Sequence, residues 1–438
     1  MTSLLAAAML ATAPAHLVPA APPPAAASGA SGSIDPEAAT RAYLDQLPPD
    51  QRARSDAYFE GGYWLSLWSF LWGAGVFVLL LHTGLSARMR DFAERITRFR
   101  ALQTAIYWTS FAVALEVLSL PLFVYRDYLR EHSYGLSNLS FGGWLGEELK
   151  GLAIVVVLGS LGMIALYAVV RRVPRTWWIW AAGVSIAFLA FGAVIGPVLI
   201  VPIFNHPTRL QDPRVVAPIL SLARANGIAT GEVWEIDASK QTKRVSANVS
   251  GLFGTERITL NDNLLNRSSL PEIEAVMGPE MGHYVLNHVY KGLMEFGIVF
   301  VAGFAVIAWL FERLRLRNQA RWRVRDVGDL AGLPLAALLF SAYLFVLTPV
   351  LNSIIRVQEY EADIFGLNAA QQPDGFAQSA LKLAEYRKLE PGPLEEVIFF
   401  DHPSGRTRIF SAMRWKAEHP ASWAAARSAS APPSADGR

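Results

Sequence analysis

The sequence predicts a mostly α-helical, polytopic membrane protein with about six spans and a small α+β domain inserted between spans four and five. Of its 438 residues, 52% are hydrophobic and only 17% are charged, and soluble proteins have about 25% charged residues. Six apolar runs are each long enough to cross a bilayer, which takes about 20 residues per helix. A more polar segment, 206–291, separates the fourth run from the fifth.

The six apolar runs set the expected domain organisation. They lie at 63–81, 102–125, 151–170, 177–199, 293–311 and 333–351. Tryptophan and tyrosine residues cluster near several of their ends, as anchors at the membrane–water interface do. We therefore expect membrane helices one to four within 60–205, the insertion at 206–291, and helices five and six within 292–355.

Both ends of the chain have low-complexity sequence. Residues 1–33 are rich in Ala, Pro and Ser and contain a short apolar run followed by small residues. This composition fits either a secretory signal peptide, although its usual positive start is missing, or a disordered N-terminus. Residues 421–438 have a similar composition, which predicts a disordered tail.

The insertion has both helical and strand patterns. A helical pattern at 215–226 ends at Gly227, and strand-like runs follow at 232–236 and 257–260. A second helix is expected to begin near Glu272 and to carry the sequence Pro-Glu-Met-Gly-His at 279–283. These elements account for the predicted α+β character of the insertion.

The sequence Pro279-Glu280-Met281-Gly282-His283 differs by one residue from His-Glu-x-x-His. In that motif, two histidines on one helix face bind zinc and the glutamate activates the metal-bound water. Alone, one glutamate and one histidine on an amphipathic helix are more often ordinary surface residues. The motif therefore needs support from other segments.

Two later segments supply that support. They are Arg-Val-Gln-Glu-Tyr-Glu-Ala-Asp at 356–363 and Asp-His-Pro-Ser-Gly-Arg-Thr-Arg-Ile at 401–409. With the three segments in this order, the chain resembles the type I CAAX prenyl endopeptidases. These are multispanning membrane zinc metalloproteases that cut peptides near their carboxyl termini. The similarity extends over about 60–412.

The resemblance implies a metal site and a base. It makes 206–291 a metalloprotease-like domain with one zinc ion, in which His283 is a ligand and Glu280 is the general base. The third ligand, Glu359, would come from the segment 356–412. Asp363 would then orient a ligand histidine, as carboxylates behind metal ligands do.

The resemblance also implies substrate contacts. His402 and Arg408 match family positions that face the substrate carbonyl, where donors stabilise developing negative charge. Asn248 matches a residue on the strand to which a bound peptide adds as an extra strand. The expected partners are therefore a peptide or protein substrate and the lipid bilayer.

Pro279 occupies the position of the first zinc ligand. A proline inside a helix also costs about 3 kcal/mol or more. His283 and Glu359 remain, one ligand fewer than catalytic zinc sites normally have. His288 cannot easily replace the missing ligand, because a step of five residues turns it about 140° around the helix from His283. His402 would have to leave its own role. We therefore predict weak zinc binding and little or no peptidase activity.

Alternatives remain at this point. Pro279 could belong to a natural inactive homologue, be an engineered or erroneous residue, or mark a site with unfamiliar ligation. The other site residues are all present, which favours a recent or artificial change. The alternative function is a non-catalytic membrane peptide-binding homologue of the same fold. A transporter is less favoured because no inverted repeat is evident.

Composition excludes several other classes. The net charge of +2 says nothing about nucleic acid, but the sequence has no interleaved basic and aromatic stripe that would suggest a nucleic-acid partner, and we expect none. The chain has no cysteine, which excludes disulfides, thiol catalysis and cysteine-ligated zinc. The pattern assigns no oligomeric state.

Arginines indicate an orientation in the membrane. They gather after the first, third and fifth spans, at 88–100, 171–175 and 313–325. The positive-inside rule places these loops in the cytoplasm. The insertion would then face the periplasm of a bacterial inner membrane, whereas analogy with the family places it toward the cytosol.

Overall fold

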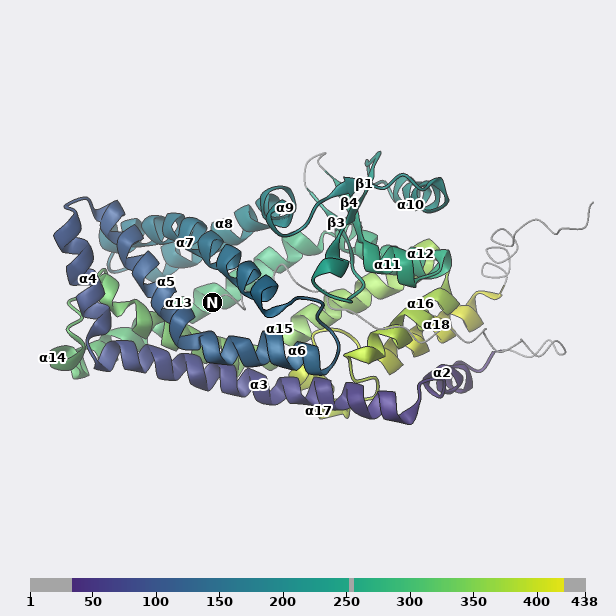
Figure 1. Ribbon diagram of the computed structural model, residues 1–438, viewed down its shortest axis with the longest axis horizontal. Coiled ribbons are helices and arrows are strands. Elements are labelled where there is room, and N and C mark those ends of the chain that lie inside the picture. Colours follow the sequence, from purple (N-terminus) through teal and green to yellow (C-terminus); the bar gives the residue numbers. More distant parts are fainter. Residues whose placement is uncertain (1–33, 252–255, 421–438) are drawn as a thin grey trace, which may run out of the picture.

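The computed structural model describes residues 34–251 and 256–420, which form a membrane helix bundle with a small sheet domain and a helical layer at one end (Figure 1). Within these described residues, six helices are long and apolar enough to cross a membrane, so the predicted fold class is confirmed. The expectations for 1–33 and 421–438 concern residues outside the described part of the chain.

The membrane helices are longer than the apolar runs that predicted them. The main segments are α3 (Pro49–His82), α5 (Arg100–Phe123), α7 (Phe141–Arg172), α8 (Trp177–Ile195), α13 (His288–Arg317) and α15 (Leu333–Ala370). α5 continues through a π-helical segment and α6 (Arg130–Ser133), and α8 continues similarly into α9 (Val201–Phe204). The expected division between 292–355 and 356–412 falls inside α15, which is one continuous helix.

The two ends of the bundle carry different elements (Figure 1). At one end lie α4 (Leu85–Ile96) and α14 (Gln319–Trp322). At the other lie the sheet and the helices α2 (Pro36–Leu44), α10 (Pro213–Ala225), α11 (Asp262–Arg267), α16 (Pro373–Lys382) and α18 (Gly405–Glu418). α17 (Pro393–Phe399) packs against α15.

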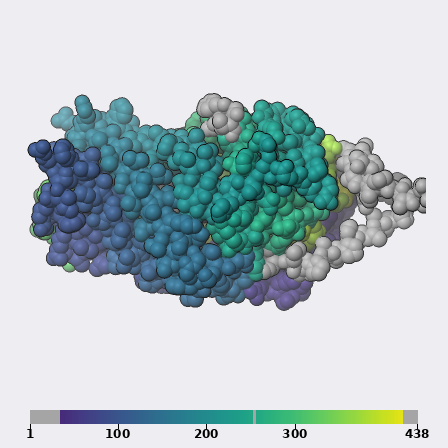
Figure 2. Space-filling view, turned by 45° about the horizontal axis from the view of Figure 1, so that its top comes forward, coloured from purple at the N-terminus to yellow at the C-terminus, as the bar shows by residue number. Residues whose placement is uncertain are grey.

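In the part of the chain that the structure describes, the sheet has four strands, in the order β1 (Thr208–Arg209), β2 (Val233–Ile236), β4 (Arg257–Asn261) and β3 (Ala247–Ser250). β2 and β4 are parallel, and the other two pairs are antiparallel. The strands expected at 232–236 and 257–260 are observed as β2 and β4. β3 is an edge strand, in which Asn248 pairs with Thr259. Figure 2 shows the teal surface of this domain adjoining the blue surface of the N-terminal helices.

Helix α12 (Leu270–Val285) lies between the sheet and α15. Its buried methionines Met277 and Met281 pack in one hydrophobic cluster with Ile258 and Leu260 of β4. A capping box at Ser269 and Glu272 fixes its first turn. The apolar face toward the sheet therefore holds the helix that carries Glu280 and His283.

The C-terminal helices form a second hydrophobic cluster on the other side of α12. Leu44 of α2 packs there with Phe376 of α16 and Ile409 of α18. This cluster fixes α18, and with it Arg408, over the crossing of α12 and α15.

Candidate active site

The site is built on a close crossing of α12 and α15. Gly278 and Gly282 of α12 face Gly366 and Ala362 of α15, and a Cβ at Gly278 would lie 2.8 Å from the Gly366 Cα. Only residues without large side chains allow backbones to approach this closely. The crossing brings Glu280 and His283 opposite the carboxylates of α15.

Pro279 lies within α12, which runs through it without interruption. The residue is buried, and its ring borders a small cavity of about 120 Å³ that Glu280 and Glu359 also line. The position that would carry the first metal ligand therefore faces the site but offers no donor atom.

Glu359 lies between two histidines from different segments. Its Oε1 is 3.4 Å from His283 Nε2, and its Oε2 is 3.3 Å from His402 Nε2. His402 directs its other ring nitrogen, Nδ1, toward Asp401 Oδ1 at 2.8 Å. The structure thus brings two histidines predicted from the sequence together around the carboxylate of Glu359, which was also predicted.

The other ring nitrogen of His283, Nδ1, contacts His288. The two Nδ1 atoms are 2.9 Å apart, and His288 Nε2 is 3.2 Å from Glu361 Oε2. The expectation that His288 points away assumed a continuous helix. Instead, α12 ends, Asn287 adopts a left-handed conformation with φ of 58°, and α13 begins at His288. This turn places His288 behind His283, on the side away from Glu359.

Asp363 pairs with Arg408. Arg408 Nε donates to Asp363 Oδ2 at 2.7 Å, and the Asp363 side chain is buried. Burial alone would lower the pKa of Arg408, but the Asp363 carboxylate outweighs it and holds this pKa above its usual value. The expected role of Asp363 was to orient a ligand histidine. Its contact is with the arginine, because a buried carboxylate needs a cationic, hydrogen-bonding partner.

Glu280 lines the cavity at the position of the general base. Burial raises its pKa to about 7, with His283 opposing the shift and Glu359 adding to it. A carboxyl group with a pKa near 7 can both accept and release a proton at neutral pH. The geometry therefore suits Glu280 to acid–base chemistry.

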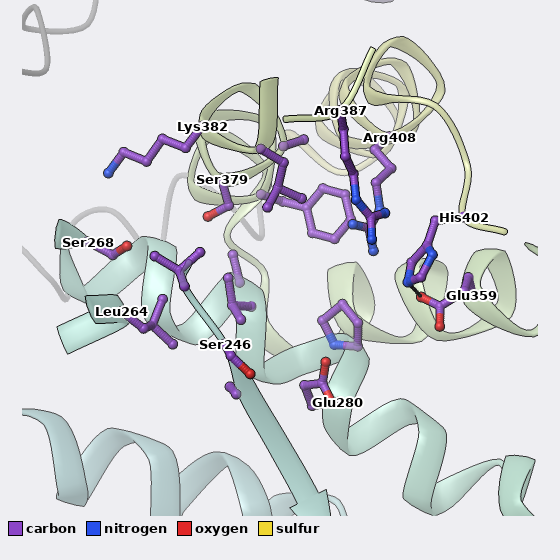
Figure 3. A pocket seen from close by; sticks show the side chains of 18 of the residues that line it. Ser246, Leu264, Ser268, Glu280, Glu359, Ser379, Lys382, Arg387, His402 and Arg408 are labelled. Carbon is purple, nitrogen blue, oxygen red and sulfur yellow. Dashed lines mark ion pairs between the residues drawn. The ribbon is translucent and has the colours of Figure 1, made fainter. Parts of the chain in front are cut away.

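The cavity has a strand on one side and helical residues on the others. Figure 3 shows Glu280, Glu359, His402 and Arg408 facing its interior. Residues 245–247, at the start of the edge strand β3, form one wall. Asn248, the predicted substrate-binding residue, is exposed and is not among the residues that line this cavity.

A larger groove of about 870 Å³ adjoins the cavity and shares Tyr386, Arg387 and His402 with it. It runs between α3, α15 and α17. Arg387 lines both spaces, and sequence reasoning did not identify it, because no motif precedes or includes it. Its position between the two spaces exists only once α16 is folded over α12.

The donor set does not fit a three-ligand zinc site. In the part of the chain that the structure describes, no group of three or more His, Cys, Asp or Glu side chains is arranged to hold a metal ion. His283 and Glu359 supply two donors, and Pro279 supplies none. Catalytic zinc normally has three protein ligands.

Comparisons with known proteins match nearly the same part of the chain as the resemblance over about 60–412. The family model "CAAX prenyl protease N-terminal, five membrane helices" matches residues 36–206, and "Peptidase family M48" matches residues 209–416. Among curated proteins, the chain is 31% identical over 336 residues to the uncharacterized metalloprotease YhfN of Bacillus subtilis. This match covers 76% of the chain and 79% of that protein.

More distant relatives agree. The chain is 25% identical over 338 residues to CAAX prenyl protease 1 of Saccharomyces cerevisiae, covering 71% of this chain and 73% of that one. The crystal structure of S. mikatae Ste24p has the same fold, with a TM-score of 0.71 at 20% identity over 86% of this chain and 95% of that one. The resemblance that the three sequence segments predicted is confirmed, and this chain belongs to peptidase family M48, as an integral membrane protein of the CAAX prenyl protease family.

Proposed function

We propose that this protein is a membrane metalloendopeptidase in which Pro279 impairs zinc binding and peptidase activity. Family membership supplies the reaction class. The observation that carries the proposal is the position of Pro279, which borders the cavity formed with Glu280, Glu359, His402 and Arg408 but offers no ligand atom.

The other residues suit peptide hydrolysis. A peptide would pair with the edge of β3 that no other strand of the described residues covers, through backbone hydrogen bonds that tolerate many side-chain sequences. Arg408 and His402 would donate to the carbonyl oxygen as it gains negative charge. Glu280 would take the proton of the attacking water. Because two metal ligands are too few to acidify that water, Glu280 alone would give little hydrolysis.

The second candidate is a non-catalytic membrane protein that binds peptides at the same place. The exposed edge of β3 beside the cavity and the missing ligand at Pro279 both favour it. In this case the cavity residues would hold a peptide without cutting it.

We also propose that the protein lies in a bacterial inner membrane with its catalytic-type domain in the periplasm. The bacterial relative supports the membrane assignment. The arginine-bearing elements α4 and α14 lie at the end of the bundle opposite the sheet domain (Figure 1). The positive-inside rule makes their end cytoplasmic. Cytosolic placement of the site is the alternative that family analogy favours.

Zinc content and cleavage of a quenched fluorescent peptide would test the impairment. The native chain, Pro279→His and Pro279→Ala are purified and dialysed against a mild chelator. We expect about one zinc per chain and cleavage only in Pro279→His, because only this change adds a ligand. Pro279→Ala controls for the loss of the proline itself.

Equal zinc in all three would show that another residue completes the site. No zinc and no cleavage in any of them, with retained peptide binding, would favour the non-catalytic function.

A further inference from the structure

Three cationic side chains line the small cavity: Lys382, Arg387 and Arg408. Two of them are already neutralised. Lys382 Nζ is 2.7 Å from a carboxylate oxygen of Glu272, and Arg408 donates to Asp363 at the same distance. The side chain of Arg387 has no hydrogen bond or ion pair with any residue of 34–251 or 256–420.

The backbone holds Arg387 in place while its side chain remains available. Its N–H donates to the Leu383 carbonyl at 3.0 Å, and its own carbonyl accepts from Ser55 Oγ of α3 at 3.2 Å. From this fixed point the half-buried side chain extends toward the cavity, near Arg408 and His402 (Figure 3). Preorganisation of this kind lowers the entropy cost of binding a ligand.

Arg387 also lies at a junction. It borders both the small cavity that contains Glu280 and the larger groove between α3, α15 and α17. A peptide that occupies the site and extends into the groove would pass its guanidinium. The next residue, Lys388, also lines the groove, but its ammonium group is already paired with Glu60 and Glu395.

Asp401 attracts the Arg387 guanidinium through space, but among the described residues no carboxylate forms a hydrogen bond or ion pair with it. Asp401 is hydrogen-bonded to His402, and Glu359 lies between His283 and His402. A partly desolvated guanidinium that has no hydrogen-bonded partner favours an anion that can accept two parallel hydrogen bonds, and carboxylates have that geometry. The missing partner is therefore expected to come from the ligand.

We propose that Arg387 is a specificity-determining residue that binds a carboxylate of the peptide ligand. The carboxylate can be the C-terminus of the peptide or an acidic side chain, and both present the same two oxygens. This inference rests on the proposed function, because it assigns specificity to the same site. It does not require cleavage, so it applies to both candidate functions.

Equilibrium binding of labelled peptides to the full chain in nanodiscs of phosphatidylcholine would test the proposal. Three ten-residue peptides of Ala, Leu and Ser carry a neutral fluorophore at the N-terminus. One has a free C-terminal carboxylate, the second is its C-terminal amide, and the third is the amide with one internal Glu. Anisotropy titrations measure their dissociation constants for the native chain and for the variants Arg387→Met, Arg387→Lys and Arg224→Met.

The native chain is expected to bind at least one carboxylate-bearing peptide about tenfold or more tightly than the uncharged amide, as a difference of about 1.4 kcal/mol gives. The peptide that gains affinity identifies the source of the carboxylate. Arg387→Met is expected to abolish the difference and Arg387→Lys to keep part of it. Arg224→Met, at the exposed end of α10, is expected to keep it fully.

Two outcomes would overturn the inference, and they can be distinguished. Equal binding of all three peptides, or a preference that survives in Arg387→Met, would remove the role of Arg387 and leave the peptide site standing. Failure of every peptide to bind the native chain would contradict the proposed function itself, and the inference would fall with it.

Discussion

The ring of Pro279 in α12 lies directly against the Cα of Gly366 in α15. A Cβ built on Gly366 would overlap the Cδ and N atoms of the proline. This contact belongs to the crossing that sets Glu280 and His283 opposite Glu359. The residue that stands where the His-Glu-x-x-His motif has its first histidine is thus also a packing element of the site.

Gly366→Ala should destabilise the fold by about 1–3 kcal/mol, because overpacking forces the two backbones apart. Denaturant unfolding of the purified protein in detergent, followed by tryptophan fluorescence, measures this. Gly146→Ala is the matched control, because Gly146 also lies inside a long helix, α7, and a Cβ there meets no described residue within 4 Å. Equal stability of Gly366→Ala and the native chain would show that the crossing tolerates a methyl group.

His288 should strengthen metal binding once a third ligand is restored. Its Nδ1 lies 2.9 Å from His283 Nδ1 and its Nε2 lies 3.2 Å from Glu361. This arrangement lets Glu361 accept from His288, and His288 accept from His283, which leaves the His283 Nε2 lone pair free toward Glu359. Residues that hydrogen bond to metal ligands typically contribute 10–100-fold to the metal affinity.

The expected result is a 10–100-fold weaker zinc affinity for Pro279→His/His288→Ala than for Pro279→His. Competition with a fluorescent zinc chelator measures both constants. Adding His206→Ala to Pro279→His is the control, because His206 is 82% exposed and far from this contact in the chain. An unchanged affinity in the His288 variant would mean that His283 is oriented by packing alone.

The fold was predictable where the signal is local. Apolar runs predicted the six membrane helices of the described residues, and strand-like runs predicted β2 and β4. The left-handed residue Asn287 was not predictable, because its conformation depends on how α12 and α13 pack. A helical projection therefore placed His288 incorrectly with respect to His283.

The site was predictable only as far as its motifs reach. The three segments identified Glu280, His283, Glu359, His402 and Arg408, and these residues line the cavity or contact Glu359. Arg387 belongs to no motif, and what distinguishes it is that its side chain lines both spaces without a hydrogen bond or ion pair to any described residue. That property exists only after α16 and α18 have packed over α12, so no pattern along the chain reports it.

Glu385 should make stability depend on pH. Its Oε1 lies 3.2 Å from Arg267, but burial outweighs this pairing and raises the pKa of Glu385 to about 8. In the unfolded chain the group titrates near 4.5. Between these values the folded protein holds a proton that the unfolded chain has lost. The stabilising contribution is therefore full below about pH 4.5 and is lost as pH rises through about 8.

Denaturant unfolding between pH 5 and 9 should show this loss in the native chain, with a slope of at most about 1.4 kcal/mol per pH unit from this one group. Glu385→Gln should reduce the slope. Glu418→Gln, at the exposed end of α18, should leave it unchanged. Parallel pH profiles for the native chain and Glu385→Gln would contradict the assignment.

The orientation in the membrane can be tested directly because the chain has no cysteine. Asn266 at the end of α11 and Gln319 in α14 are both exposed and lie on opposite ends of the bundle. If the arginines of α4 and α14 face the cytoplasm, an impermeant maleimide should label Asn266→Cys but not Gln319→Cys in intact spheroplasts. Both should be labelled after the membrane is permeabilised, which controls for reactivity.

Labelling of Gln319→Cys alone would reverse the proposed orientation and place the site in the cytoplasm. A peptidase fold in the periplasm would meet exported and membrane proteins, whereas one in the cytoplasm would meet newly made chains, so this result also decides which peptides to test.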